Sequence, residues 1–149
     1  MGQSLSQLYV HLTFGTKGRY PFITEDIETK LHSYMAGILK NKESPAIKIN
    51  SVADHIHILF RLSKNYALAK VIEDVKKYSS RWLKDEGIKG FTWQIGYGAF
   101  SVSSSKLEVV IEYIINQKHH HKTKTYKEEI EEFIKEYDIL EYDEKYFWS

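Results

Sequence analysis

Hydrophobic and polar positions alternate near the start of the chain, in the segment LYVHLTF of residues 8–14. Successive side chains of a β-strand point to opposite faces, so apolar residues at every second position are typical of a strand with one buried face. The segment therefore predicts a first strand, which ends at a glycine-containing turn over 15–18. Its apolar positions are Leu8, Val10, Leu12 and Phe14.

Apolar residues at helical spacing predict four helices farther along the chain. The first spans about 24–40 and begins at a threonine suited to be its N-cap, and the second spans about 66–86. The capping-box sequence SKLE opens a third helix over about 105–118. A short acidic helix follows over 126–137.

Three further segments are rich in residues that favour strands. AIKIN (46–50) and HIHILFRL (55–62) predict two strands joined by a short turn, and FTWQIGYGAFSV (91–102) predicts a fourth strand. Gly96 and Gly98 in the last segment indicate a bulge, a close backbone approach, or a hinge ahead of the third helix.

The order strand, helix, strand, strand, helix, strand predicts an α+β fold. We expect a ferredoxin-like antiparallel sheet with helices on one face, plus a C-terminal tyrosine-bearing helix and a short extra helix. With 149 residues, 42% of them hydrophobic, the chain has the size and composition of one folded domain. We take 1–149 as a single domain, with a core of about 5–136 and an acidic, aromatic tail over 137–149.

Cysteine is absent from the sequence, which excludes disulfides and thiolate metal sites. Any metal ion must therefore be held by nitrogen and oxygen ligands. The N-terminal segment lacks a basic start followed by a long apolar stretch, and no apolar run approaches the roughly 18 residues of a membrane span. These features predict a cytoplasmic protein that does not insert into a membrane.

Charge is distributed unevenly along the chain. Residues 126–149 include nine acidic and three basic residues, for a net charge of −6, whereas residues 1–125 have a net charge of +7. A basic body is suited to binding a polyanion such as nucleic acid. The acidic segment is either a solvated helix or a competitor for the same surface.

His55 and His57 lie two residues apart in the apolar segment DHIHILF. On a strand they point to the same side, while Ile56 and Ile58 point to the other. Two imidazoles presented together by a rigid strand suit a divalent metal ion, but two ligands do not complete a site. On spacing alone, the alternative is a pair of hydrogen-bonded histidines on a sheet face.

Tyr113 and Gln117 are four residues apart on the predicted third helix, so they share one helical face beside its apolar stripe. Of the eleven tyrosines, only Tyr113 and Tyr137 are followed four residues later by a side chain that commonly ligates a metal ion. Tyr137 lies in the acidic tail, where a phosphate is unfavourable. Spacing alone leaves open that Tyr113 is a packed aromatic residue.

Three segments together resemble a known family. DHIHILF (54–60), WQIGYGAFSVS (93–103) and VIEYIINQKHHHKTKTYKEE (110–129) occur in an order and spacing similar to the single-tyrosine HUH transposases of the insertion-sequence 200/605 group. These proteins belong to small bacterial and archaeal mobile elements. The resemblance covers roughly 5–136, and nothing beyond about 137 can be carried over from it.

By this resemblance, His55 and His57 are the histidines of the His-hydrophobe-His motif, Tyr113 is the catalytic nucleophile, and Gln117 is the third metal ligand. The family uses Mg²⁺ or Mn²⁺ and works as a homodimer on single-stranded DNA with hairpins near the element ends. In many members the tyrosine helix acts in trans. The resemblance implies a DNA transposase that cleaves and rejoins single strands through a 5′-phosphotyrosine intermediate, in a bacterial or archaeal cytoplasm.

Two alternatives stay open at this point. One is a domesticated or non-transposing ferredoxin-like protein that binds nucleic acid. The other is a replication-type or relaxase-type HUH nuclease, although the short chain leaves no room for a helicase or a second domain.

Basic residues near the expected site, and on the second helix, are candidate DNA contacts. The segment KHHHKTK directly follows Gln117, and contacts from it would position DNA without reading its sequence. On the second helix the alternative is an ordinary solvated face. The predicted contacts are Lys118, His119, His120, Lys122, Lys124, Arg81 and Lys77.

The other histidines and the tail aromatics carry weaker expectations. Consecutive residues at a helix end point in different directions, so we expect His119, His120 and His121 to face DNA or solvent and not to share an ion. His11 and His32 are expected to be structural or surface residues. The tail aromatics are expected to pack on the body or on a partner.

Overall fold

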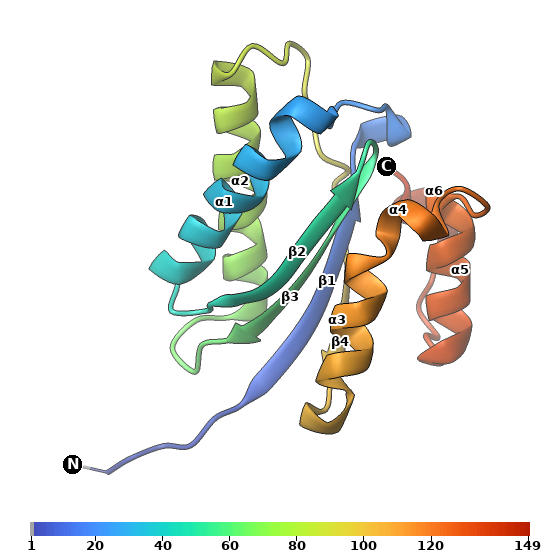
Figure 1. Ribbon diagram of the computed structural model, residues 1–149. Coiled ribbons are helices and arrows are strands. Elements are labelled where there is room, and N and C mark those ends of the chain that lie inside the picture. Colours follow the sequence, from blue (N-terminus) through green and yellow to red (C-terminus); the bar gives the residue numbers. More distant parts are fainter. Residues whose placement is uncertain (1) are drawn as a thin grey trace.

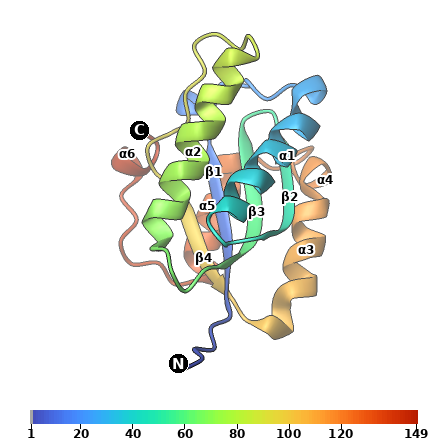
Figure 2. The same cartoon turned by 90° about the vertical axis from the view of Figure 1, so that its left-hand side faces the viewer.

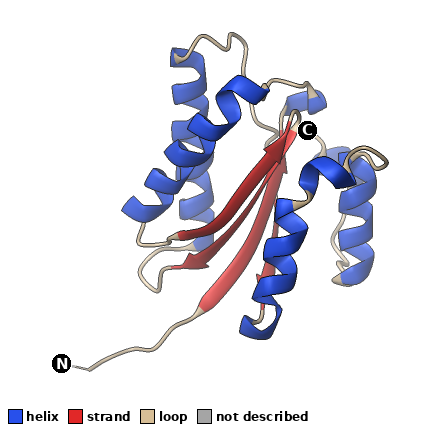
Figure 3. Ribbon diagram, in the orientation of Figure 1, coloured by secondary structure: helices blue, strands red, loops and turns tan. Residues whose placement is uncertain are grey.

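The computed structural model describes residues 2–149, and a four-stranded antiparallel sheet forms its centre (Figure 1; Figure 3). The order of strands across the sheet is β2-β3-β1-β4, so β1 and β3 each pair on both sides. The hairpin of two strands predicted around the histidines is confirmed. The strands are β1 (Leu8–Gly15), β2 (Ala46–Val52), β3 (His55–Leu62) and β4 (Gly98–Val102).

Two long helices, α1 (Glu25–Asn41) and α2 (Leu68–Asp85), cover one face of the sheet (Figure 2). Their apolar stripes pack on alternate residues of β1 and β3, as the period of two along those strands requires. These helices complete the strand and helix order of the predicted ferredoxin-like α+β fold. Fully buried residues of this core include Leu12, Phe14, Leu31, Met35, Ile56, Ile58, Phe60, Val71 and Val75.

Lys42, which follows α1, forms an ion pair with Asp74 of α2 and so ties the two helices together. The ammonium nitrogen of Lys42 lies 2.6 Å from Asp74 Oδ2, and that of Lys70 lies 3.3 Å from Oδ1. Asp74 is buried. The hydrogen bond from Lys42, followed by that from Lys70, holds the pKa of Asp74 below its ordinary value.

The C-terminal helices form a second layer on the opposite face of the sheet (Figure 1). They are α3 (Leu107–Ile115), α4 (Gln117–His120) and α5 (Tyr126–Glu136), and a short α6 (Glu144–Phe147) follows. Leu59, Val102 and Ile114 form the apolar contact between α3 and the sheet. Helices therefore cover both faces, and the tyrosine-bearing helix lies across the sheet from α1 and α2.

The third helix begins and ends differently from the prediction. The SKLE segment makes no capping box: Ser104–Lys106 is a 3₁₀ turn, and α3 begins at Leu107 without a side-chain cap. The tight turn after β4 takes up these residues, because Lys106 N–H donates to the carbonyl of Ser103. The helix is also interrupted at Asn116, where the prediction had it continuing.

The segment predicted as a long fourth strand is only partly a strand. β4 begins at Gly98, and the part before it makes a single isolated bridge between Trp93 and Thr16. Gly96 marks a close backbone approach, because a Cβ there would lie 3.1 Å from the carbonyl oxygen of Phe147. The C-terminal residues occupy this space.

Phe147 and Trp148 of the aromatic tail pack on the body, as predicted, whereas Tyr146 is 67% exposed. The side chain of Gln94 donates to the carbonyl of Phe147 at 2.7 Å, and the backbone of Ile95 donates to the carbonyl of Ser149 at 3.0 Å. The ring of Trp148 lies against Tyr126. Within residues 2–149, no helix has the length and apolarity needed to cross a lipid bilayer.

Candidate metal and tyrosine site

β3 presents His55 and His57 on the face of the sheet that α3 to α5 cover. Both side chains are fully buried, and their ring centroids are 5.2 Å apart. Ile56 and Ile58 point into the core on the other face. The alternation predicted from the sequence is thus present, and it brings two imidazoles to one place.

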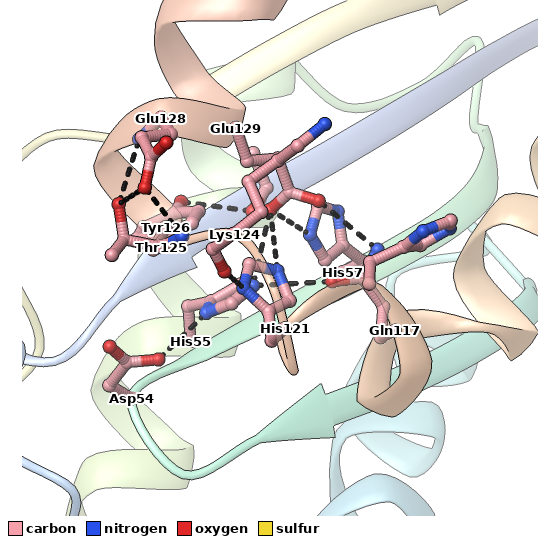
Figure 4. Close-up of polar contacts among 12 residues, drawn as sticks. Asp54, His55, His57, Gln117, His121, Lys124, Thr125, Tyr126, Glu128 and Glu129 are labelled. Carbon is pink, nitrogen blue, oxygen red and sulfur yellow. Dashed lines mark hydrogen bonds and ion pairs between the residues drawn. The ribbon is translucent and has the colours of Figure 1, made fainter.

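Asp54 orients the ring of His55. His55 Nδ1 lies 2.8 Å from Asp54 Oδ1, and because an ionised carboxylate only accepts, Nδ1–H donates. Nε2 is consequently directed toward α4 and α5 (Figure 4). Burial alone would lower the pKa of His55, but hydrogen bonds to Asp54 and Glu129 raise it above its ordinary value.

His11 of β1 orients the ring of His57. A hydrogen bond of 2.8 Å joins His11 Nε2 to His57 Nδ1, and this leaves His57 Nε2 free to face the helices. Burial, together with the neighbouring His57, lowers the pKa of His11 to about 3. His11 is therefore a neutral structural residue. The pKa of His57 is also lowered, chiefly by burial.

Tyr113 and Gln117 reach the histidines of their own chain. Gln117 is fully buried, and its Oε1 lies 3.3 Å from His55 Nε2, while the rings of Tyr113 and His57 pack edge to face with centroids 5.7 Å apart. The side-chain amide of Asn50, on β2, donates to the carbonyls of Ile114 at 2.8 Å and of Ile115 at 3.2 Å. These bonds fix the end of α3 where the helix is interrupted.

A carboxylate that the sequence analysis missed occupies the middle of this group. Glu129 Oε1 lies 3.2 Å from the Nε2 atom of His55, 3.0 Å from that of His57 and 3.3 Å from that of His121 (Figure 4). Burial opposes ionisation of Glu129, but the imidazoles, His57 foremost, hold its pKa far below the ordinary value. The one local signal was the sequence TYKEE, which begins α5.

In that sequence Thr125 and Glu128 form a true capping box. The Thr125 hydroxyl accepts from the backbone N–H of Glu128, and the Glu128 carboxylate accepts from the backbone N–H of Thr125. The box places Glu129 in the first turn of α5. Tyr126, the first residue of α5, is fully buried against His55, and its hydroxyl forms a hydrogen bond of 2.9 Å with the hydroxyl of Thr13.

His121 lies in the site, which corrects our expectation that it faces DNA or solvent. α4 is a single turn that ends at His120, so the chain changes direction and His121 turns inward. Its Nδ1 lies 2.6 Å from the carbonyl oxygen of Lys124, and its ring centroid lies 4.4 Å from that of His55. His119 remains exposed, as predicted.

The hydroxyl of Tyr113 donates to Glu129 Oε2, and the amide of Gln117 donates to the same oxygen at 3.2 Å. Burial and the adjacent carboxylate raise the pKa of Tyr113 well above its ordinary value. In this arrangement Tyr113 is therefore a neutral phenol. The ring of His120 stacks on it at a centroid distance of 4.8 Å.

The donor set of this cluster fits a divalent cation. One ligand atom from each of His55, His121 and Glu129 can be chosen so that all three lie within 4.8 Å of one another. Imidazole nitrogens, a carboxylate and an amide oxygen are ligands of Mn²⁺, Zn²⁺ and related ions. His57 and Gln117 also contact Glu129, His57 at Oε1 and the Gln117 amide at Oε2.

A groove of about 820 Å³ opens beside the cluster. Asp54 and His121 belong to its lining, and so do the basic side chains of Arg19, Lys122 and Lys124. Lys122 is exposed, whereas Lys124 forms an ion pair with a glutamate of α5. The other lining residues are Pro21, Val52, Ala53, Thr123, Thr125, Tyr126 and Lys127.

The remaining predicted DNA contacts are dispersed. Lys118 lies outside the groove and pairs with Glu28 of α1 at 2.8 Å. Lys77 and Arg81 are on α2, which covers the opposite face of the sheet from the histidines. A DNA contact from these two residues would require a separate surface.

Comparison with known proteins identifies the family. Residues 4–117 match the family model described as "Transposase IS200 like". The matched segment contains His55, His57, Tyr113 and Gln117, and it ends before His121 and Glu129. A search of curated proteins found no match.

Two solved structures share the fold. A protein of Deinococcus radiodurans R1, provisionally assigned as a transposase, is 19% identical with a TM-score of 0.64; the alignment covers 78% of this chain and 96% of that one. A REP-associated tyrosine transposase bound to a REP hairpin is 13% identical with a TM-score of 0.61, over 81% of this chain and 72% of that one. The family match spans most of the sequence, and the fold agrees with it: the chain belongs to the IS200-like transposases.

Proposed function

We propose that this protein is a transposase that cleaves and rejoins single-stranded DNA at mobile-element ends, with Tyr113 as its nucleophile. The observation that carries the proposal is the convergence of Tyr113 and Gln117 on His55 and His57 within one chain. These four residues lie on three elements, β3, α3 and α4, and more than fifty positions along the chain separate the histidines from Tyr113 and Gln117. No packing requirement accounts for four polar side chains meeting there. Family membership supports the same activity.

In the proposed step, the hydroxyl oxygen of Tyr113 attacks a phosphorus atom of the DNA backbone. A bond forms between that oxygen and phosphorus while the bond from phosphorus to the 3′-oxygen breaks. The phenol gives up one proton and the departing 3′-oxygen gains one, so the products are a 5′-phosphotyrosine and a free 3′-hydroxyl. Attack by another 3′-hydroxyl on the phosphotyrosine rejoins strands without an external energy source.

His55, His57 and Gln117 would hold the Mg²⁺ or Mn²⁺ that the family resemblance implies. When bound, a divalent ion would offset negative charge on the phosphate under attack and on the neighbouring Glu129. The protein's own contribution is orientation: Asp54 fixes the ring of His55, and His11 fixes that of His57.

We further propose that single-stranded DNA beside a hairpin enters through the groove lined by Arg19 and Lys122. The solved relative bound to a REP hairpin supports a hairpin partner. Joining two ends needs two nucleophiles, which favours a homodimer. Because Tyr113 already contacts its own chain's histidines, cleavage itself would proceed in cis. The setting is a bacterial or archaeal cytoplasm.

The test is formation of a covalent protein–DNA adduct. The protein is mixed with a pool of end-labelled single strands, each with a hairpin flanked by randomised segments, in Mn²⁺ or in chelator. We expect a denaturant-resistant adduct that requires the ion and is lost in Tyr113→Phe. Tyr78→Phe, on α2, is the matched control and should retain the adduct. Binding without an adduct would instead identify a non-cleaving DNA-binding protein.

A further inference from the structure

Three imidazole nitrogens meet one carboxylate oxygen at spacings that suit a shared metal ion. The Nε2 atoms of His55, His57 and His121 lie 3.2, 3.0 and 3.3 Å from Glu129 Oε1. Gln117 Oε1 lies 3.3 Å from His55 Nε2. Neighbouring ligands of one ion, each bound at about 2.0–2.2 Å, lie roughly 3.0–3.4 Å apart. Each of these spacings is within or close to that range, and ligand atoms of His55, His121 and Glu129 also lie within 4.8 Å of one another.

The hydrogen bonds at Nδ1 of His55 and His121 also suit these rings to metal binding. His55 Nδ1 faces the carboxylate of Asp54, and His121 Nδ1 faces the carbonyl of Lys124; both partners only accept hydrogen bonds. Each ring is thus held through its Nδ1, and Nε2 is the nitrogen that faces Glu129 Oε1. Such outer hydrogen bonds are typical of metal-bound histidines.

Glu129 also lacks an ordinary counter-ion. Its side chain is 1% exposed, and within residues 2–149 no lysine or arginine pairs with it. A buried carboxylate is costly unless a cation compensates its charge. The rigid start of α5, fixed by the capping box, holds Glu129 in this position.

We propose that His121 and Glu129 complete the metal site of this chain, giving five ligands: three imidazole nitrogens, one carboxylate oxygen and the amide oxygen of Gln117. This inference deepens the proposed transposase function and rests on its metal site. Both added ligands come from outside the segment that matches the family. A nitrogen-rich set selects a late first-row transition ion, such as Co²⁺ or Zn²⁺, over Mg²⁺. In six-coordination one position stays open for a phosphate oxygen.

The test is metal titration of the full chain without DNA, by calorimetry and by the visible absorption of Co²⁺. We expect one ion per chain and binding of Co²⁺ at least about a hundredfold tighter than Mg²⁺. His121→Ala and Glu129→Gln should each weaken Co²⁺ binding by at least about tenfold and change the position and intensity of its absorption bands. His119→Ala and Glu131→Gln, exposed neighbours on the same segments, should leave both unchanged.

Equal Co²⁺ affinity and identical absorption bands in the wild type, His121→Ala and Glu129→Gln would overturn the inference. Circular dichroism of each variant identifies any that fail to fold, and His121→Ala, which changes a side chain at the rim of the groove, keeps the test available if Glu129→Gln unfolds. Because no DNA is present, this result is separate from adduct formation. Weakened binding in the variants without any adduct would support the five-ligand site and reject the proposed transposase.

Discussion

The ring of Tyr126 lies parallel to the imidazole of His55, with 3.9 Å between their centroids and 10° between their planes. Tyr126 approaches this closely because β1 has Gly15 beneath it: a Cβ on Gly15 would lie 2.9 Å from the Tyr126 ring. The stack joins α5 to β3. The position of Glu129, three residues later on α5, depends on it.

Replacing Tyr126 should therefore affect both stability and the metal site. Tyr126→Ala removes a fully buried ring, and we expect a loss of about 3–5 kcal/mol in the free energy of unfolding, together with weaker Co²⁺ binding. Tyr126→Phe keeps the stack and loses the hydrogen bond to Thr13, at a cost of about 1 kcal/mol. Urea denaturation measures the two changes in stability. An unchanged Co²⁺ affinity in Tyr126→Ala would show that the metal site does not depend on the position of α5.

Asn50 determines where α3 ends, and through it the position of Tyr113. Asn50→Ala leaves two helix-terminal carbonyls without their side-chain donor, so we expect a loss of about 1 kcal/mol in the free energy of unfolding. The rate of adduct formation should fall by a larger factor than the loss of stability explains, because Tyr113, the proposed nucleophile, is no longer held in place. Asn65→Ala, an exposed position, is the control. An unchanged adduct rate would show that α3 is positioned by its apolar contacts alone.

Asp54 accepts a hydrogen bond from His55, and its loss should weaken metal binding without changing the fold. For Asp54→Ala we expect metal affinity to fall by roughly 10- to 100-fold, the effect of losing the outer partner of a metal-bound histidine. Asp54→Asn keeps an accepting oxygen, so its metal affinity should fall less than that of Asp54→Ala. Calorimetric titration with Mn²⁺ gives the order. A larger loss in Asp54→Asn than in Asp54→Ala would contradict this role.

Arg19 and Lys122 should contribute electrostatically to DNA binding. Each cation that neutralises one phosphate of a single strand adds about 0.7 to the slope of log K against log salt, so Arg19→Ala and Lys122→Ala should each lower the slope by about that amount. Fluorescence anisotropy at several salt concentrations measures it. Lys77→Ala and Arg81→Ala test the surface of α2, and slopes lowered only in these two variants would place the strand on the opposite face.

The ion pair between Lys42 and Asp74 should make stability depend on acid pH. Its hydrogen bond holds the pKa of Asp74 in the folded chain below the unfolded value of about 3.9, so as pH falls the unfolded chain takes up this proton first. The stabilisation is present at neutral pH and is lost as pH falls below about 4. Asp74→Asn should therefore lower the melting temperature at pH 7 and differ less from the wild type at pH 3. The same difference in melting temperature at pH 7 and at pH 3 would argue against a stabilising ion pair.

Features contained within one element were predictable from the sequence. The alternation of β3 predicted that His55 and His57 share a face. The spacing of four predicted that Tyr113 and Gln117 share one face of a single helix; they are in contact, but the helix is interrupted between them at Asn116. Their meeting was also inferred, but from the family resemblance, because no local pattern relates residue 57 to residue 113.

His121 and Glu129 could not be predicted in the same way. Their positions depend on where the chain turns after α4 and on how α5 docks against Tyr126 and His55, which are long-range packing events. The two capping-box sequences show the limit of a local motif: SKLE and TYKE both match the pattern, but only Thr125 with Glu128 forms the bonds. The 3₁₀ turn that follows β4 takes up the SKLE residues and prevents them from forming a capping box.

One side of β3 packs Ile56 and Ile58 into the apolar core, and the other side presents His55 and His57 and packs Leu59 against α3. Deleting or inserting one residue within this strand would exchange the isoleucines and the imidazoles, so folding and activity would be lost together. Point substitution is different, since replacing a histidine here leaves the isoleucines where they are. Substitution of either histidine should therefore remove the proposed metal site and leave a folded protein, whereas a change of length in β3 should remove both the site and the fold.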